Sequence, residues 1–201
     1  MSKERLEAFS DGVFAFAITL LVLNITVPAQ AGAVSEAWLW HELGSHWPDY
    51  ISYATSFLVL AIIWTNHHAM FLRLKYIDRH TIMYNMLLLM TTVLIPFSTA
   101  LLARYPRLAP SAFIYGLVLT LCSIGFNLLW WHVIRVPDSH TFTRAEKRSN
   151  TPRFLLGLGV YFAAMVIALF APVVSIVAYL GITLYYFIPG GVDRPSVHSE
   201  G

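Results

Sequence analysis

The stretch Phe9–Val27, FSDGVFAFAITLLVLNITV, decides the fold of this chain. It is close to the ~20 mostly apolar residues that a helix needs to cross a membrane, and Pro28 ends it. Its one charged residue, Asp11, lies near its start. An ionisable group at membrane depth is costly and usually has a partner and a function. A carboxylate at the membrane surface would instead cap the start of the helix, and both interpretations stay open at this point.

The composition is that of an integral membrane protein. Of 201 residues, 57% are hydrophobic and 12% are charged, whereas soluble domains have about 25% charged residues. The mean hydropathy is +0.63. We expect one transmembrane domain over residues 1–188 and a polar, disordered tail over 189–201. The single cysteine, Cys122, excludes an intrachain disulfide.

Six stretches are suited to transmembrane helices, so the expected fold is all-α. The fifth and sixth come from dividing residues 154–188 at Ala171-Pro172, because proline disfavours helix in the residue before it. Pro96 predicts a kink or distortion in the third stretch. A polar loop is expected over Arg135–Arg153. The first four stretches cover about 9–27, 49–71, 81–103 and 110–134.

The positive charges predict that both ends of the chain lie in the cytoplasm. With six spans, eleven of the thirteen Lys and Arg residues fall on the side of the two termini, and only Arg104 and Arg107 on the other. Positive residues are enriched on the cytoplasmic side of membrane proteins. The loop over 29–48 has no Lys or Arg but has three Trp residues, which suits a segment in the outer interface.

Two motifs of polar and aromatic residues meet at the cytoplasmic side of the predicted bundle. The second motif places its three defining residues on one helix face. A buried network of Arg5, Asp11 and His67 would compensate charges that are otherwise costly to bury. The motifs are Arg5-x-x-x-Phe9-Ser10-Asp11 and Trp64-x-x-His67-x-x-x-Phe71.

One face of the first helix forms a stripe when residues are placed at about 100° intervals. The stripe alone does not distinguish a pore from a lipid-facing or packed surface, because nearly the whole helix is apolar. Its one hydroxyl is that of Thr19, and the simplest state of that hydroxyl is a hydrogen bond to the Ala15 carbonyl. The stripe consists of Gly12, Phe16, Thr19, Leu20, Leu23 and Val27.

The sequence carries no catalytic motif. In His41-Glu42-Leu43-Gly44-Ser45-His46, the histidines are separated by about 140° around a helix, whereas a zinc protease needs them four residues apart. A Gly-rich phosphate loop and a carbonyl-type potassium filter are also missing from the sequence. We therefore expect no catalysis, no cofactor, no nucleic-acid partner and no metal beyond a permeating potassium ion. Any ion selectivity has to come from side chains.

The two motifs and the six-span layout resemble the endosomal and lysosomal potassium channel family and its bacterial homologues. The resemblance covers essentially the whole chain. Bacterial members have one six-helix repeat and form tetramers, so the resemblance implies a homotetramer. It also implies a plasma-membrane channel for potassium and other monovalent cations, weakly selective for potassium over sodium.

The resemblance further implies roles for single residues. Four copies of the first helix would line the pore, with Phe16 as the main constriction and Leu20 and Leu23 as further apolar rings. Thr19 would be the hydroxyl that contributes to selectivity, and the two motifs would pack between helices and hold the pore helix. Phe16 departs from the Ile or Leu of relatives. Four phenyl rings would either close the pore more fully or offer π faces to a cation, worth about 0.5–2 kcal/mol.

Two other functions compete with a channel. A proton-coupled carrier would use Asp11 and His67 as a proton relay, but no obvious inverted repeat or pair of broken helices supports it. A membrane enzyme or a structural subunit would need features that the sequence does not show. A channel gives large passive currents, whereas a carrier moves protons in a fixed ratio to its substrate.

Overall fold

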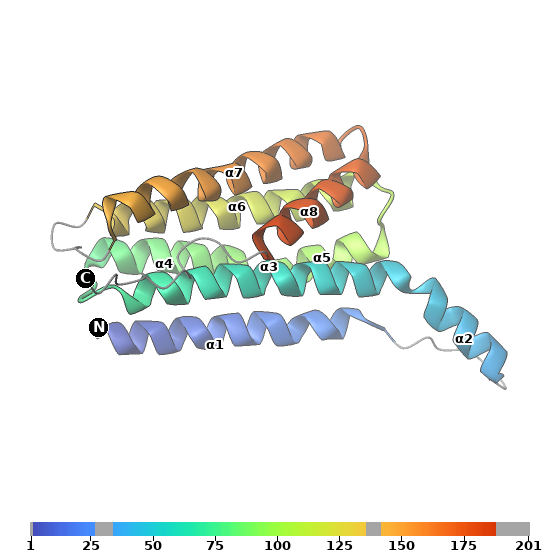
Figure 1. Cartoon of the computed structure of the whole chain (residues 1–201). Helices are drawn as coiled ribbons and strands as arrows, with labels where there is room; N and C mark the ends of the chain where they lie inside the picture. Colours follow the sequence, from blue (N-terminus) through green and yellow to red (C-terminus); the bar gives the residue numbers. More distant parts are fainter. Residues whose placement is uncertain (1, 27–33, 136–141, 188–201) are drawn as a thin grey trace, which may run out of the picture.

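The structure is a computed structural model that describes residues 2–26, 34–135 and 142–187. These residues form helices and no strand, which confirms the all-α prediction. Most helices run alongside one another in one bundle, and α2 projects from one end of it (Figure 1). The elements are α1 (Lys3–Leu21), the 3-10 helix η1 (Val22–Asn24), α2 (Glu36–Ser45), α3 (Trp47–Leu72), α4 (Arg79–Thr92), α5 (Ile95–Arg104), α6 (Ala109–Val133), α7 (Arg144–Ala168) and α8 (Pro172–Phe187).

Five helical segments of the described residues are long and apolar enough to cross a membrane, so the chain is a multi-pass membrane protein. One of them, Arg79–Arg104, consists of α4 and α5, and Pro96 lies in the first turn of α5, where a distortion was predicted. α8 begins at Pro172, as expected, but its 16 residues extend only about 24 Å. That is shorter than the ~30 Å hydrocarbon core of a membrane.

Several predicted boundaries were wrong. α1 begins at Lys3, six residues before the expected start, because Ser2 caps it: the Ser2 hydroxyl accepts a hydrogen bond from the Arg5 N–H at 3.4 Å. The expected outer loop contains α2, whose N-cap is Ser35. The predicted end of the first span at Val27 and the tail over 189–201 lie outside the described residues.

The largest correction concerns α7, which begins at Arg144 instead of continuing as a loop to Arg153. Thr143 and Glu146 form a capping box, in which each side chain accepts a hydrogen bond from the backbone N–H of the other residue. Glu146 also pairs with Arg73 at 2.6 Å, which ties the start of α7 to the end of α3. These contacts stabilise the polar first turns of α7 as helix, whereas hydropathy alone assigns them to a loop.

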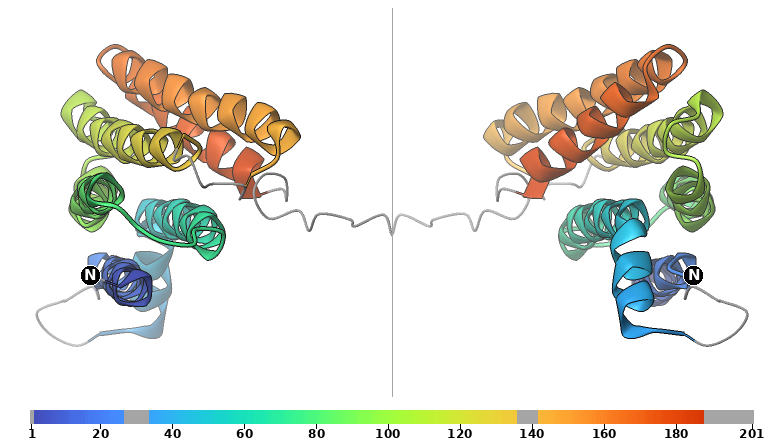
Figure 2. Two further views of the ribbon diagram at one scale, coloured as in Figure 1. Left: turned by 90° about the vertical axis from the view of Figure 1, so that its left-hand side faces the viewer. Right: turned by 90° about the vertical axis from the view of Figure 1, so that its right-hand side faces the viewer.

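α6 lies in the middle of the bundle. It packs on α4 and α5 on one side and on α7 and α8 on the other. Gly125 permits the close approach of α4, because a Cβ atom there would lie 3.1 Å from Leu88 Cα. α1 lies at one edge of the bundle, and α7 and α8 lie at the opposite edge (Figure 2). The predicted pore helix is therefore peripheral in the single chain.

The start of α1 lies at the same end of the bundle as the connection between α3 and α4 and the start of α7 (Figure 1). Lys3 Nζ donates to the Leu72 carbonyl at 3.5 Å, which joins the first turn of α1 to the last turn of α3. This end carries Arg73, Arg79 and Arg144. The prediction that it faces the cytoplasm agrees with this placement and stays a prediction.

Candidate functional site

α1 attaches to the rest of the bundle along one face, which packs against α3, α4 and α5. The face is mostly apolar, and its one polar member is Ser10. Ala17 in its middle lets the neighbouring helices approach closely. The buried residues recur at helical spacing and are Leu6, Ser10, Phe14, Ala17 and Leu21.

The opposite face of α1 carries the predicted stripe and is exposed in the single chain. Phe16 is 61% exposed and Leu23 is 71% exposed. Gly12 and Thr19 are exposed as well, and Leu20 is partly buried. The last stripe position lies outside the described residues. The stripe therefore turns away from the bundle to which α1 is attached.

A chain of hydrogen bonds crosses the buried side of α1 and joins it to α3 and α4. His67 Nε2 lies 2.7 Å from Asn85 Oδ1, Asn85 Nδ2 donates to Ser10 Oγ at 2.9 Å, and the Ser10 hydroxyl donates to the Leu6 carbonyl at 2.8 Å. Because the amide oxygen of Asn85 accepts, His67 Nε2 is assigned as the protonated nitrogen. Ser10, His67 and Asn85 are buried. The network holds three helices together without burying an ion pair.

Asp11 has a neutral partner, which corrects the expected network. Trp64 Nε1 donates to Asp11 Oδ1 at 2.9 Å. Arg5 is exposed, and within the described chain no hydrogen bond or ion pair joins Asp11 to Arg5 or to His67. Arg5 lies six residues before Asp11, about 120° around the helix, so its side chain leaves on another side. We call Ser10, Asp11, Trp64, His67 and Asn85 the inner anchor.

Aromatic rings pack around His67. Its ring stacks on Phe71, with the centroids 4.2 Å apart, and lies 5.5 Å from the Phe14 ring. Phe71 and Phe14 are both buried. Phe9 was expected in the same network but is 53% exposed, because it falls on the side of α1 that faces away from α3 and α4. Of the residues in the two motifs, Phe9 and Arg5 are thus exposed and do not pack against the other helices of the chain.

The Thr19 hydroxyl donates to the Phe16 carbonyl at 2.9 Å, one position later than the predicted Ala15 carbonyl. This bond uses the hydrogen of the hydroxyl but leaves lone pairs on its oxygen. Since Thr19 lies on the exposed face, that oxygen can still accept a ligand. The Thr19 hydroxyl can therefore donate to the helix backbone and accept a cation at its oxygen at the same time.

The C-terminal end of α1 has an attachment of its own. Asn24, at the end of η1, donates through Nδ2 to the Pro96 carbonyl of α5 at 3.0 Å. Neither Asn24 nor Asn85 was among the predicted site residues. The available signal was an amide side chain inside an apolar span, which has to find a hydrogen-bond partner when it is buried.

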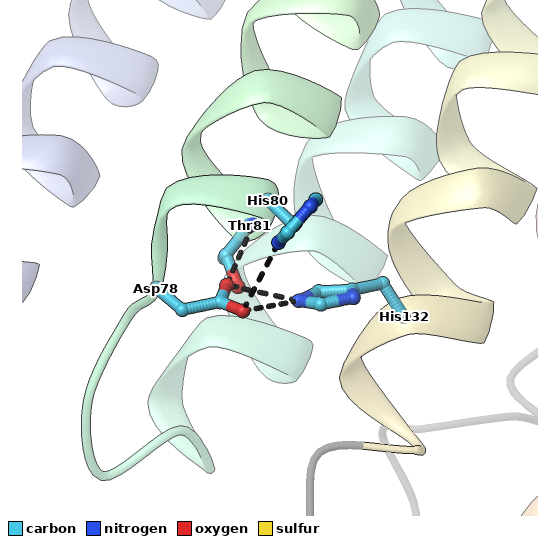
Figure 3. A network of polar contacts seen from close by, with 4 residues as sticks. All are labelled: Asp78, His80, Thr81 and His132. Atoms are coloured by element: carbon cyan, nitrogen blue, oxygen red, sulfur yellow. Dashed lines mark hydrogen bonds and ion pairs between the residues drawn. The ribbon is translucent and has the colours of Figure 1, made fainter.

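A second polar junction joins the start of α4 to α6 (Figure 3). The Asp78 carboxylate caps α4 by accepting from the Thr81 N–H at 2.8 Å, and both of its oxygens lie within 3.0 Å of His132 Nε2. His80 Nδ1 is 3.8 Å away. Partial burial opposes ionisation of Asp78, but the hydrogen bonds from Thr81 and His132 outweigh it and hold the pKa of this carboxyl well below its usual range.

Metal binding finds no support in the arrangement of ligating side chains. Across residues 2–26, 34–135 and 142–187, no group of three His, Cys, Asp or Glu residues is placed to hold a metal ion. The chemistry that the site can offer is therefore that of an apolar surface with a hydroxyl oxygen, presented by a helix that is fixed from behind.

Proteins that are similar to this chain in sequence and fold are described as potassium channels. Residues 5–96 match the family described as "Endosomal/lysosomal potassium channel TMEM175". A potassium channel of Streptomyces collinus is 40% identical over 190 residues, 90% of each chain, and one of Chamaesiphon minutus is 36% identical over 90% of this chain and 92% of its own. The crystal structure of a lysosomal potassium-selective channel TMEM175 homologue from Chamaesiphon minutus matches with a TM-score of 0.80 at 36% identity, covering 92% of this chain and 96% of that one.

Proposed function

We propose that this chain, which belongs to the TMEM175 family of potassium channels, conducts potassium and other monovalent cations across the cell membrane. The conducting unit is a homotetramer in which four copies of α1 surround the pore. The observation that carries the proposal is the exposed stripe of α1, with Phe16 61% and Leu23 71% exposed, on a helix whose opposite face is fixed to the bundle.

A tetramer explains why α1 is both peripheral and firmly attached. A single chain has no central pore, so conduction needs several copies around an axis. Homo-oligomers favour closed symmetry. At the edge of the bundle, α1 can meet its own copies while α7 and α8 remain on the far side (Figure 2). The exposed Phe9 and Arg5 then lie where a neighbouring copy can cover them.

The constriction is formed by side chains. Rings of Phe16, Leu20 and Leu23 narrow the pore at successive turns, and apolar rings of this kind gate by dewetting. Phe16 is the largest of the three and sets the narrowest point. Leu20 is partly buried in the single chain, so it lies at the side of the stripe and projects less far into the pore than Phe16 and Leu23 do.

Thr19 supplies the polar position of the stripe. Its hydroxyl hydrogen is bonded to the Phe16 carbonyl, so its lone pairs are the part available to a passing cation. Four hydroxyl oxygens replace only part of a potassium ion's hydration shell. Without a filter of backbone carbonyls, the selectivity for potassium over sodium is weak.

The inner anchor supports the pore without lining it. Ser10, His67 and Asn85 are buried behind α1, away from the stripe. Their hydrogen bonds fix the rotation of α1 about its own axis, because a turn of the helix would break the bond from Asn85 to Ser10. The anchor therefore decides which face of α1 the pore receives.

Purified protein in liposomes tests the proposal directly. In a potassium gradient against sodium, we expect a passive current whose reversal potential lies modestly toward the potassium equilibrium potential. Mass measurement in mild detergent should give four chains. A monomer that conducts, or a stable tetramer without passive flux of any monovalent cation, would contradict the proposal.

A proton-coupled carrier is the competing function. It would need a relay between Asp11 and His67, but Asp11 accepts from Trp64, and His67 contacts Asn85. The same liposomes decide between the two functions when a pH indicator is enclosed. Proton movement in a fixed ratio to potassium would support the carrier, and potassium current without it would support the channel.

A further inference from the structure

A cavity lies on the side of α3 that faces away from α1. It has a volume of about 70 Å³ and lies between α3, α6, α7 and α8. None of its lining residues carries a charged side chain, and most of the wall is apolar or aromatic, including Val59, Ile63, Phe126, Phe154 and Tyr161. The cavity shares no residue with the inner anchor or with the stripe of α1. It therefore belongs to neither part of the proposed pore.

Asn127 of α6 lines this cavity and has an unused acceptor. The residue is only 7% exposed. Its Nδ2 donates to the carbonyls of Ser123 at 2.8 Å and Phe154 at 3.3 Å, whereas Oδ1 has no hydrogen-bond partner among the residues that the structure describes. The two bonds fix the orientation of the amide, because both nitrogen hydrogens are held by carbonyl oxygens. The cavity thus combines an apolar wall with one buried acceptor, which is costly to leave unpaired.

We propose that this cavity binds a small uncharged molecule that has an apolar body and one hydroxyl group, namely a short aliphatic alcohol that has partitioned into the membrane. Its hydroxyl donates to Asn127 Oδ1, and its carbon chain packs against the aromatic and aliphatic wall. A charged ligand would meet no counter-charge among the lining residues.

The size of the cavity sets the size of the ligand. Its volume of about 70 Å³ is roughly half of the ~150 Å³ at which an engineered apolar cavity holds benzene. A hydroxyl and about two carbon atoms therefore fit inside, and the remaining carbons of 1-butanol lie at the open side of the cavity. The cavity is only partly enclosed, so a longer chain can leave part of itself outside.

Photolabelling of the purified full-length protein tests this site without any measurement of current. The probe is a photoreactive butanol with a diazirine on carbon 3, and its methyl ether, which cannot donate a hydrogen bond, serves as the matched probe. We expect saturable labelling by the alcohol on peptides containing Cys122, Tyr161 or Tyr186, suppressed by excess 1-butanol. The ether should label these peptides about fivefold less at equal concentration.

Two variants locate the interaction. Asn127→Leu removes the acceptor and should weaken the apparent affinity about fivefold, which corresponds to the roughly 1 kcal/mol of one hydrogen bond. Ser123→Leu fills the cavity but keeps the Asn127 amide, whose bond uses the backbone carbonyl of Ser123, so it should abolish saturable labelling while the acceptor stays in place. Ile124→Leu, a conservative change at an exposed position of the same helix, should leave labelling unchanged.

Three results would overturn the proposal. Labelling that spreads over the exposed surfaces and does not saturate would indicate partitioning at the lipid boundary. Equal labelling by the ether, or unchanged affinity in folded Asn127→Leu, would indicate that the acceptor binds water instead of the ligand. Because the readout is binding, these outcomes do not depend on whether the protein conducts.

Discussion

α1 and α7 lie at opposite edges of the bundle (Figure 2). In the most apolar stretch of each of these two segments, the same share, 28%, is buried. Beyond the polar first turns of α7, its exposed surface is mostly aliphatic and aromatic, as at Leu156 and Phe162. That of α1 also includes large apolar residues, but the hydroxyl of Thr19 lies among them. Exposure alone therefore does not tell a pore-lining helix from a lipid-facing one.

The two helices differ in where side-chain hydrogen bonds attach them. Those of α7 lie mostly in its first half, as where Trp130 Nε1 donates to the Thr151 hydroxyl at 3.0 Å. Beyond them α7 packs closely along α6 and α8, and at Gly157 a Cβ atom would lie 2.8 Å from the Tyr186 hydroxyl. α1 and η1 have such bonds at both ends, to α3 and α4 at one end and to α5 at the other. Apolar packing tolerates small rotations of a helix, whereas a hydrogen bond has a direction, so bonds at both ends fix the face that α1 presents.

The largest effect is expected from Asn85→Leu, which removes the centre of the inner anchor. The change leaves the buried Nε2 hydrogen of His67 without an acceptor, at a cost of about 1–3 kcal/mol. Thermal melting of the detergent-solubilised protein should show a clear loss of stability and of tetramer. Asn127→Leu between α6 and α7 is the matched control and should be nearly neutral, because its amide donates only to carbonyls of regular helices. Equal melting temperatures for the two variants would remove the distinction between the attachments.

Phe16→Ala should raise the conductance several-fold, because a wider apolar ring wets more easily. Phe162→Ala on α7 is the matched control: Phe162 is 54% exposed, close to the 61% of Phe16. Single-channel recording in planar bilayers compares the two. If both variants conduct like the parent protein, the constriction lies elsewhere, and if both change, the exposed faces of α1 and α7 are not distinct in function.

Asp11→Asn should lower the stability by less than about 1 kcal/mol and leave the reversal potential unchanged. The carboxylate accepts from the neutral Trp64 indole, and an amide oxygen can accept the same bond. The large penalty of a broken buried ion pair does not apply here. Melting and reversal potential are measured on the same preparation. A shifted reversal potential at unchanged stability would place Asp11 next to the ion.

Thr19→Val should reduce the preference for potassium over sodium about twofold while the current persists. The variant keeps the shape of the side chain and removes both the oxygen and its bond to the Phe16 carbonyl. Reversal potentials in mixed potassium and sodium gradients measure the change. An unchanged potential would mean that the hydroxyl serves the helix backbone alone.

The smallest effect is expected at Asp78. This residue joins the start of α4 to α6, and within the described residues its hydrogen bonds reach neither α1 nor α7, the helices at the two edges of the bundle. Because its pKa is lowered in the folded state, its contribution to stability is present above about pH 4 and is lost as the pH falls further. Asp78→Asn should therefore weaken the pH dependence of melting below pH 4 and little else. Parallel pH profiles for the variant and the parent would show that the carboxylate does not contribute.

The amino-acid sequence predicts the spans better than their contacts. Apolar runs and the positions of Pro96 and Pro172 identified the helices and two of their breaks. The start of α7 was missed although Thr143 and Glu146 have the spacing of a capping box, because the polar residues between them and Phe154 lowered the hydropathy. Helical periodicity also separated the exposed stripe from the buried face of α1.

Partners across helices were harder to predict. The expected pairing of Arg5 with Asp11 followed from their charges, but they leave α1 in different directions, and Trp64 on the facing helix is closer. Asn85 reaches Ser10 across 75 positions of the chain. Which of several polar residues in an apolar span makes such a contact depends on helix rotation and depth, and one sequence does not determine either.

The bond from Asn24 to the Pro96 carbonyl has a mechanical consequence. Together with Ser10 at the inner end, it clamps α1 at two points fourteen residues apart, about 21 Å along the axis. A helix held at both ends cannot pivot about one of them. It can only bow or twist between its clamps, where Phe16 and Thr19 lie. If four copies of α1 line the proposed pore, we expect it to open by side-chain reorientation and slight bending at mid-span, not by spreading of the helix ends.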